Sequence, residues 1–412
     1  MNGKKIAIVG TGISGLTCAY HLSRNHNVTI FESEDYIGGH THTVEVEKDG
    51  EKVKIDTGFI VFNDRTYPNF TKMMEEIGVS SQKTEMSFSV RNDALALEYN
   101  GGSLTGLFAQ PRNMVRPAFW RLLRDVVRFN QEVREASEDN STLLGEFLNR
   151  GKYSQHFREN YIIPMVSAIW SMGFAGCYEF PLSFFFKFFD NHGLLDFTNR
   201  PQWYTIQGGS SSYIEPLTRR FRKNIRLNTP VIGLRRRQES VEVETALGTE
   251  VFDEVILACH GDQALALIRE PSHKELEVLS AFTCSDNSVI LHTDTSHLPK
   301  ARRAWAGWNY RVIDSALHQA TLTYNMNILQ RLDSNHTYLV SLNQDIADEH
   351  VLARFHYSHP VYTTDAVMAQ KKWQSVSGAA SLHFCGAYWH NGFHEDGVNS
   401  ALRVCRMVEG KS

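Results

Sequence analysis

The sequence has few cysteines, and none of them stands close to another. No C-x-x-C pair occurs, which argues against a zinc site or a disulfide framework. Dispersed thiols of this kind fit the reducing cytoplasm best. The six cysteines are Cys18, Cys177, Cys259, Cys284, Cys385 and Cys405.

The chain also lacks a strong excess of charge and any long apolar run. Its formal net charge is -4, so no global field favours nucleic acid or an acidic membrane, and any basic partner surface has to be local. Glycines interrupt the first apolar stretch too early for a signal peptide, and no run is long enough to span a bilayer. We therefore expect a cytoplasmic protein without a nucleic-acid partner. Any membrane contact would be peripheral, at the inner face.

The length and composition indicate more than one domain. A chain of 412 residues, 42% hydrophobic and 21% charged, is an ordinary globular protein but too long for one ordinary core. Strands next to helices are expected at 4–32 and 382–408, and a further patch has a half-exposed strand at 241–245 and a buried one at 255–259. A helical, Arg- and Phe-rich region (105–200) and a strand-rich region (285–365) lie between them. Because no repeat or low-complexity linker separates these regions, we predict an α/β fold with interleaved domains.

Residues 10–15 match G-x-G-x-x-G, and each glycine has its own physical reason. Gly10 permits a tight turn, Gly12 lets a pyrophosphate approach the backbone, and Gly15 lets helix and strand pack closely. The pattern follows an apolar strand and opens a helix, whose N-terminus favours phosphate. Glu32 ends the next strand, where its carboxylate accepts hydrogen bonds from ribose hydroxyls. A carboxylate here also disfavours NADP, because it repels a 2′-phosphate.

The stretch 32–41 resembles the second phosphate-and-ribityl loop of the flavin amine oxidase and phytoene desaturase superfamily. That loop commonly reads E-x-x-x-R-x-G-G-R, and here Tyr36 and His40 replace its two arginines. Gly38 and Gly39 remain, which permits close passage of the backbone beside a cofactor. The replacements remove cationic phosphate contacts and depart from the common amine oxidase pattern.

Further stretches carry the same resemblance. Residues 55–60 resemble the superfamily's D-x-G segment, whose backbone runs past the isoalloxazine ring. Residues 384–387 and 392–398 resemble its closing flavin motif, in which a helix beginning near Asp396 directs its dipole at the flavin. Residues 208–212 also resemble a superfamily landmark, and Val231 would contact adenine through its backbone. The upstream glycine-cysteine motif of covalent flavin links is absent, so the resemblance implies non-covalent FAD.

The resemblance implies a division of the chain and a set of cofactor contacts. A discontinuous, Rossmann-like FAD-binding domain would comprise 1–75, 208–268 and 373–412, and an interleaved α+β substrate domain 76–207 and 269–372. A bacterial subgroup of FAD-binding proteins is more closely similar, sharing the D-Y-x-G-G-H-T-H-T and G-F-H-E-D-G runs. That subgroup resembles an N-terminal domain of plant cyclopropane fatty acid synthases. The implied cofactor contacts are Gly10, Gly12, Ile13, Ser14, Gly15, Glu32, Ser33, Gly38, Gly39, His40, Thr41, Gly58, Phe59, Ile60, Val231, Gly386, Asp396, Gly397 and Val398.

Candidate catalytic residues follow from the same motifs. Tyr388 and Trp389 follow the Gly386 loop, where the superfamily presents aromatic residues to the substrate; core packing is the alternative. His394 is expected at the flavin edge, as is His40. The histidines His40, His42, His390 and His394 have no acidic partner at ligand spacing, so we expect no metal. The serines of 210–212 lack a hydrolase elbow and are expected to cap the next helix.

Two segments allow two interpretations each. The aromatic run 180–189 is either ordinary core or the wall of an apolar tunnel. In the helix expected over 112–134, Arg121, Arg124 and Arg128 share one face. Either this helix packs on its own domain, or its basic amphipathic character rests on an anionic membrane. Its expected apolar face comprises Phe119, Leu123, Val126 and Val127.

The sequence therefore predicts an FAD-dependent oxidoreductase that moves a hydride between a carbon substrate and the flavin. The aromatic run, the cyclopropane-synthase likeness and the missing arginines favour a long acyl chain, unsaturated or cyclopropane-bearing. The alternatives are a flavin-dependent double-bond isomerase, an amine oxidase, or a non-catalytic FAD-stabilised partner of a lipid-modifying enzyme. On the cofactor, the alternative is an NAD-only dehydrogenase.

Overall fold

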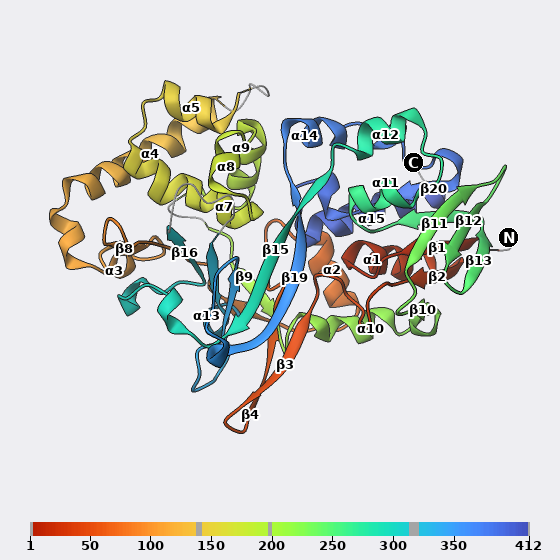
Figure 1. The fold of residues 1–412 in the computed structure, drawn as a ribbon, viewed down its shortest axis with the longest axis horizontal. Helices are drawn as coiled ribbons and strands as arrows, with labels where there is room; N and C mark the ends of the chain where they lie inside the picture. The colour runs from red at the N-terminus through yellow and green to blue at the C-terminus, as the bar shows by residue number, and fades with distance from the viewer. Residues whose placement is uncertain (1–2, 137–141, 197–199, 313–320, 411–412) are drawn as a thin grey trace.

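The computed structural model describes residues 3–136, 142–196, 200–312 and 321–410. Figure 1 shows a parallel sheet with its helices on the right, a large mixed sheet in the middle, and a group of helices at the upper left. Both termini lie at the right-hand end. Among the described residues, no helix combines the length and apolarity needed to cross a membrane.

The parallel sheet draws its strands from three distant parts of the chain. Its order is β10 (Ile225–Arg226), β2 (Asn27–Phe31), β1 (Lys5–Val9), β14 (Glu254–Leu257) and β20 (Leu382–Phe384). The neighbouring strands are all parallel. Ile6, Ala7 and Ile8 are completely buried, which explains the continuous apolar run of β1. The α/β fold predicted from the sequence is thus confirmed.

Two helices pack together beside this sheet. These are α1 (Ile13–Leu22) and α15 (His394–Val408), from opposite ends of the chain. The hydroxyl of Ser14 donates to the carbonyl of Gly397 over 3.0 Å, and a Cβ on Gly397 would lie 2.7 Å from Ile13. The two ends of the chain therefore meet with little room between their helices. Also in this part are β11 (Val231–Arg236), β12 (Val241–Thr245), β13 (Gly248–Phe252), α2 (Pro68–Glu76), α10 (Ile214–Thr218), α11 (Gly261–Leu267) and α12 (His273–Leu279).

The mixed sheet forms the middle of the molecule. Its order is β19 (Val351–Val361), β15 (Thr283–His292), β18 (Leu339–Leu342), β17 (Leu322–Asn325), β16 (Trp308–Val312), β7 (Phe88–Asn92) and β8 (Leu97–Asn100). Within the described part of this sheet, β16 and β7 are the one parallel pair, and the other neighbouring strands are antiparallel. The hairpin of β3 (Thr43–Lys48) and β4 (Glu51–Asp56) buries Val46 and Ile55 in the same core as Val289 and Leu291 of this sheet. A smaller sheet joins β5 (Val61–Asn63), β9 (Trp203–Ile206) and β6 (Ser81–Thr84).

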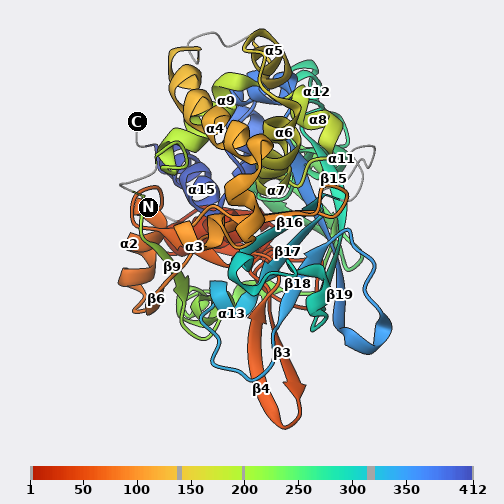
Figure 2. The same ribbon diagram turned by 90° about the vertical axis from the view of Figure 1, so that its left-hand side faces the viewer.

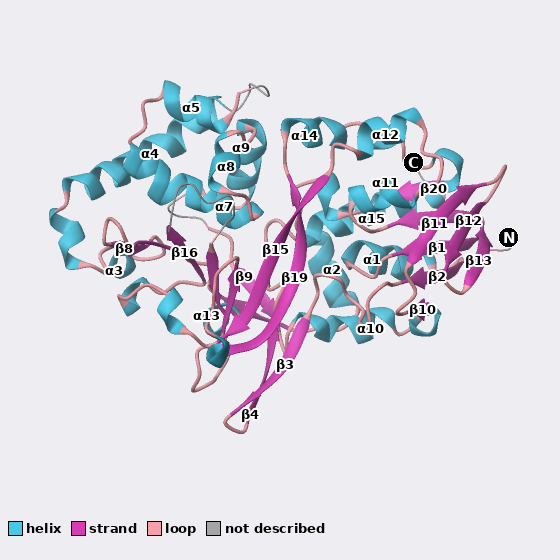
Figure 3. Cartoon of the chain, viewed as in Figure 1, coloured by secondary structure: helices cyan, strands magenta, loops and turns pink. Residues whose placement is uncertain are grey.

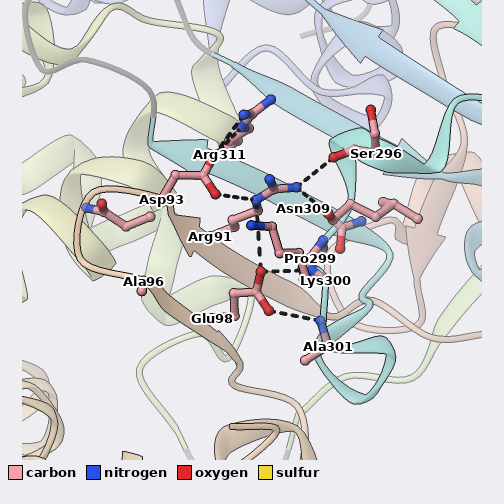
Figure 4. Close-up of polar contacts among 12 residues, drawn as sticks. Arg91, Asp93, Ala96, Glu98, Ser296, Pro299, Lys300, Ala301, Asn309 and Arg311 are labelled. Carbon is pink, nitrogen blue, oxygen red and sulfur yellow. Dashed lines mark hydrogen bonds and ion pairs between the residues drawn. The ribbon is translucent and has the colours of Figure 1, made fainter.

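A buried ion-pair network fixes one end of the mixed sheet (Figure 4). Arg91 of β7 donates to Asp93 over 2.9 Å and lies 3.9 Å from Glu98 of β8. Its guanidinium also donates to the carbonyls of Ser296 and Leu298. Glu98 in turn accepts from two backbone N–H groups, those of Lys300 and Ala301. The network therefore ties two adjacent strands to the loop after β15.

The helices at the upper left enclose an aromatic core, and Figure 3 shows how few strands this region contains. The run 180–189 lies in it: Phe180, Phe185 and Phe189 are at most 1% exposed. These side chains pack as core, and α9 carries most of the run. The helices are α3 (Leu104–Leu107), α4 (Pro117–Ala136), α5 (Leu144–Arg150), α6 (Gln155–Phe157), α7 (Ile163–Trp170), α8 (Phe174–Tyr178) and α9 (Leu182–Asn191).

The helix predicted over 112–134 is α4, which begins later, at Pro117. Its apolar face is turned inward, with Phe119 completely buried and Val126 7% exposed. The expectation for Val127 was wrong, because this side chain is 45% exposed. The face that packs continues instead through Phe129, at helical spacing from Val126.

Candidate functional site

The glycines of the first loop have distinct environments. Gly10 has φ +101°, which favours glycine, and a Cβ on Gly15 would lie 2.1 Å from the carbonyl oxygen of Gly10. A Cβ on Gly12 would meet nothing within 4 Å. The loop therefore closes tightly at its two ends and leaves open space beside Gly12. This is the cradle that a pyrophosphate needs at a helix N-terminus.

The second loop lies against the first. A Cβ on Gly39 would lie 3.2 Å from the Cα of Gly12, and the N–H of Gly38 donates to the hydroxyl of Thr11 over 3.1 Å. Glu32 is buried and accepts from the N–H and hydroxyl of Thr11 with one carboxylate oxygen. Its other oxygen accepts from the hydroxyl of Ser33 and from the N–H of Glu34. Glu32 thus orders the loop itself, and its predicted contact with ribose stays a prediction.

Three predicted residues from separate segments meet in one group: His394, Thr41 and Phe59. The imidazole Nε2 of His394 is 3.1 Å from the hydroxyl of Thr41 and 3.3 Å from that of Tyr213. Phe59 stacks on the same imidazole. Burial lowers the pKa of His394 to about 3, so the ring is neutral at physiological pH. Tyr213, which the sequence did not single out, also bonds directly to Thr41.

His40 belongs to a second histidine group. Its ring centroid lies 5.5 Å from that of His359, 6.0 Å from His260 and 5.3 Å from Tyr357. Burial, followed by the charges of neighbouring histidines, holds the pKa of His40 well below its usual value. Its Nε2 is buried without a partner among the described residues. A buried polar atom of this kind, next to the Gly12 loop, fits a site completed by a polar ligand.

The four histidines weighed in the sequence do not gather at one point. His42 bonds the hydroxyls of Tyr357 and Thr57, at 2.7 and 3.1 Å, and stacks on Tyr36. Among the described residues, the group whose side chains could share a metal ion consists of His260, Asp262 and Cys284, and it contains none of those four histidines. Its potential ligand atoms lie within 4.8 Å of one another. Asp262 of this trio is exposed, as surface carboxylates commonly are.

Asp56 connects the hairpin β3–β4 to the short 3-10 helix Ser210–Tyr213, which directly precedes α10. One carboxylate oxygen accepts from the hydroxyl of Thr43 and from the N–H and hydroxyl of Ser210. Burial raises the pKa of Asp56 to about 6. The expectation that residues 210–212 cap the next helix was wrong, because Tyr213 precedes α10 and Ser210 bonds Asp56. The hydroxyls of Ser210 and Thr43 therefore both donate to the buried carboxylate of Asp56.

Gly58 and Ile60 follow Asp56 along the chain. A Cβ on Gly58 would lie 2.2 Å from the carbonyl oxygen of His40, so the D-x-G segment passes directly behind the second loop. The carbonyl of Ile60 accepts from the hydroxyl of Thr205 over 2.9 Å, and its side chain is buried.

The closing motif forms the start of α15. The helix begins at His394, two residues before the predicted Asp396, whose carboxylate accepts from the N–H of Phe393 over 2.9 Å. Burial raises the pKa of Asp396 to about 7. The N–H of Gly386, which lies before the helix, donates to the hydroxyl of Ser400 in α15, and Val398 is buried. These hydrogen bonds therefore fix the segment before α15 to the first turns of that helix.

Tyr388 and Trp389 lie in the core beside β20. Both rings contact Phe282, with centroids 4.8 Å from it, and both residues are at most 3% exposed. The Tyr388 hydroxyl and the Trp389 indole N–H have no partner among the described residues. Val231, at the start of β11, is 9% exposed. Cys385 is a free thiol 3.9 Å from that of Cys18, so no disulfide joins them.

Comparison with known proteins gives the class. The profile of the family described as flavin containing amine oxidoreductase matches residues 13–310. The chain shares 49% identity over 45 residues with protoporphyrinogen oxidase 2 of Arabidopsis thaliana, which is 11% of this chain and only 9% of that protein.

Two solved structures share the fold over nearly their whole length. A structure from Exiguobacterium sp. 255-15, provisionally assigned as a protoporphyrinogen oxidase, has a TM-score of 0.69 at 19% identity. A fatty acid isomerase from P. acnes that produces CLA has a TM-score of 0.70 at 14% identity. Each alignment covers 100% of this chain and 99% of the other.

The match to the family covers well over half of the chain, so the chain belongs to the flavin-containing amine oxidoreductase family. It is an FAD-dependent oxidoreductase, as predicted, and the alternative of a dehydrogenase that binds NAD alone was wrong. The open space beside Gly12 and the unpartnered Nε2 of His40 fit that cofactor. Which residues hold the cofactor stays a prediction from the sequence.

Proposed function

We propose that this protein oxidises or reduces a carbon–carbon bond of an apolar acyl substrate. The observation that carries the proposal is the stacking of Phe393 on Phe188, with ring centroids 4.8 Å apart and an angle of 20°. Phe393 immediately precedes α15, and Phe188 belongs to the aromatic core of α9. The aromatic region and the closing flavin motif are therefore adjacent, as an apolar substrate that reaches the flavin requires.

A second contact joins the same two regions. The indole N–H of Trp170, in the aromatic core, donates to the carbonyl of Asn391 over 3.4 Å. Asn391 precedes α15 by three residues. An acyl chain gains about 0.8 kcal/mol for each methylene it buries, so an apolar site next to these contacts would need no strong polar anchor to hold it.

The polar groups around His394 favour an uncharged substrate. His394, Thr41 and Tyr213 form a closed set of neutral groups, since burial lowers the pKa of the imidazole and raises that of the phenol. They offer no charge to an ammonium group. FAD supplies the hydride acceptor when it is bound. We propose that the neutral imidazole of His394 presents an N–H or a lone pair to the edge of the flavin and orients that edge.

We also propose that FAD is held by 1–75, 208–268 and 373–412, and the substrate by the remainder. The expectation of a lipid substrate also rests on the sequence resemblance to a bacterial subgroup, which itself resembles an N-terminal domain of plant cyclopropane fatty acid synthases.

A double-bond isomerase is the second candidate, because a fatty acid isomerase shares this fold over the whole chain. An isomerase returns the hydride to the same substrate, so no net oxidation occurs.

Product analysis separates the candidates. The purified protein is incubated in air with unsaturated and cyclopropane-bearing lipids and, separately, with primary amines. A lipid product lighter by a pair of hydrogens supports the proposal. A product of unchanged mass with a moved double bond identifies an isomerase. An aldehyde from the amines, with the lipids unchanged, contradicts the proposal and identifies an amine oxidase.

A further inference from the structure

Exposed apolar side chains are concentrated in one part of the chain. Among the described residues, twelve large apolar side chains are exposed, and six of them lie between positions 95 and 127. Val115 is 81% exposed and Leu104 77%, which are high values for such residues in contact with water. Scattered apolar residues are normal on a surface, whereas a group marks an interaction site. The six are Leu95, Leu104, Met114, Val115, Trp120 and Val127.

The same part of the chain is strongly basic. Between positions 99 and 131 it has five arginines, no lysine and a single acid, Asp125, which is buried. Arg128 pairs with Asp125 and Glu132, but none of the ion pairs among the described residues includes the other four arginines. These four are Arg112, Arg116, Arg121 and Arg124.

The exposed apolar and basic side chains lie on adjoining elements. Arg112 and Arg116 both donate to the carbonyl of Ala96, which directly follows Leu95. The indole N–H of Trp120 donates to the carbonyl of Met114 over 2.7 Å, which joins α4 to the short helix Pro111–Val115. We call this surface the basic–apolar patch: Leu95, Leu104, Met114, Val115 and Trp120 with Arg112, Arg116, Arg121 and Arg124.

The charges of the patch are felt by a neighbouring histidine. Burial is the main cause that lowers the pKa of His156; the charges of Arg116 and Arg121 lower it further, and Glu159 acts in the opposite direction. Figure 2 shows α3 and α4 together on the side of the molecule that Figure 1 places at the left, opposite the parallel sheet.

We propose that the basic–apolar patch docks onto an anionic lipid bilayer. Val115, Leu104 and Met114 enter the headgroup region, Trp120 lies at its boundary, and the four arginines contact lipid phosphates. A nucleic acid would engage the arginines but leave Val115 and Leu104 in water, so the combination favours lipid. The apolar anchor differs from the one considered in the sequence, because Phe119 and Val126 of α4 are buried. This proposal is independent of the substrate.

Sedimentation with vesicles tests the proposal on the full-length holoprotein. Vesicles of phosphatidylcholine alone are compared with vesicles that also contain phosphatidylglycerol, at low and moderate salt. Each arginine near an anionic leaflet contributes about fivefold to partitioning. Replacing two of them, as Arg121→Gln with Arg124→Gln, lowers binding to the anionic vesicles by roughly 30-fold. Val115→Ser with Leu104→Ser weakens binding as well, by a salt-independent factor.

Two control variants remove the same chemistry elsewhere. Arg222→Gln with Lys223→Gln removes two exposed positive charges outside the patch, and Leu247→Ser with Val251→Ser removes exposed apolar side chains from β12–β13. Both controls are expected to sediment like the wild type. Absence of sedimentation with anionic vesicles at low salt overturns the proposal. So does equal loss in the controls, or binding to heparin without binding to vesicles, which would indicate a soluble acidic partner.

Discussion

The imidazole of His394 lies flat against the ring of Phe59, with centroids 3.5 Å apart and planes 11° apart. His394 opens the last helix of the chain, and Phe59 follows the hairpin β3–β4, so the contact joins segments more than 300 residues apart. It places a neutral imidazole, Thr41 and Tyr213 in one buried group. Several consequences can be measured.

Replacing His394 by Gln is expected to destabilise the protein by about 1–3 kcal/mol, because the stacking is lost and Thr41 and Tyr213 lose a partner. The retained flavin is also expected to show a shifted absorption spectrum. Urea unfolding and the visible spectrum measure the two effects. The control is the exposed His356→Gln, which should change neither. An unaltered spectrum with full stability would remove His394 from the flavin edge.

Gly12 and Gly15 are expected to respond differently to alanine. At Gly12 the new Cβ meets nothing within 4 Å, so Gly12→Ala keeps the apoprotein folded but weakens FAD retention. At Gly15 the Cβ would lie 2.1 Å from a backbone oxygen, so Gly15→Ala costs stability, about 1–3 kcal/mol. Thermal unfolding and the flavin released on denaturation distinguish the two. Full FAD retention in Gly12→Ala would mean that the loop has another role.

The ion pair between Arg91 and Glu98 predicts a large cost for removing one partner. Arg91→Met leaves the buried Glu98 with its backbone N–H donors but without a cationic partner. It also removes the donor to the carbonyls of Ser296 and Leu298, so the expected destabilisation is about 3–5 kcal/mol. The matched control is Arg354→Met, whose partner Asp348 is 94% exposed, with an expected cost below about 1 kcal/mol. Chemical denaturation measures both. Similar costs would contradict the role given to burial.

Stability is expected to fall as pH falls from about 6.5 to about 4. Burial lowers the pKa of four histidines to about 4 and that of a fifth to about 3. As the pH falls, these histidines therefore bind protons in the unfolded chain before they do so in the folded protein. Asp56 and Asp396 have raised pKa values and act in the opposite direction, but they are fewer. The histidines are His192, His292, His359, His390 and His394.

A single variant tests this linkage. His192→Gln removes one such group, so the slope of unfolding free energy against pH is expected to decrease by up to about 1.4 kcal/mol per pH unit. Urea unfolding across that range measures it. An unchanged slope would mean that His192 titrates alike in the folded and unfolded chains.

Much of the fold could be predicted because its signals are local. The apolar run of β1, the glycine turn and α1 follow each other within twenty residues, and Gly10 and Gly15 have the environments expected of them. The start of α15 was predicted near Asp396, two residues later than its observed start at His394. His394 is buried through tertiary contacts.

The contacts of the site depend on residues far apart in sequence. Tyr213 directly follows the landmark 208–212 but is not part of it, and no motif surrounds His359. Only the fold brings these two residues to Thr41 and His40. Ser210 reads as a helix cap because serine commonly caps, whereas here the buried Asp56 competes for its hydroxyl. The sequence signal for that network was a carboxylate at the end of an apolar-ended strand, Asp56 of β4.

The most direct test of the central claim is the flavin absorbance of the holoprotein during anaerobic mixing with an unsaturated or cyclopropane-bearing acyl lipid. Without oxygen, a substrate that delivers a hydride to FAD leaves it reduced, so the yellow absorbance disappears. We predict bleaching by the acyl lipid and none by primary amines. Bleaching by the amines, with the flavin still oxidised in the presence of every acyl lipid, would contradict the account.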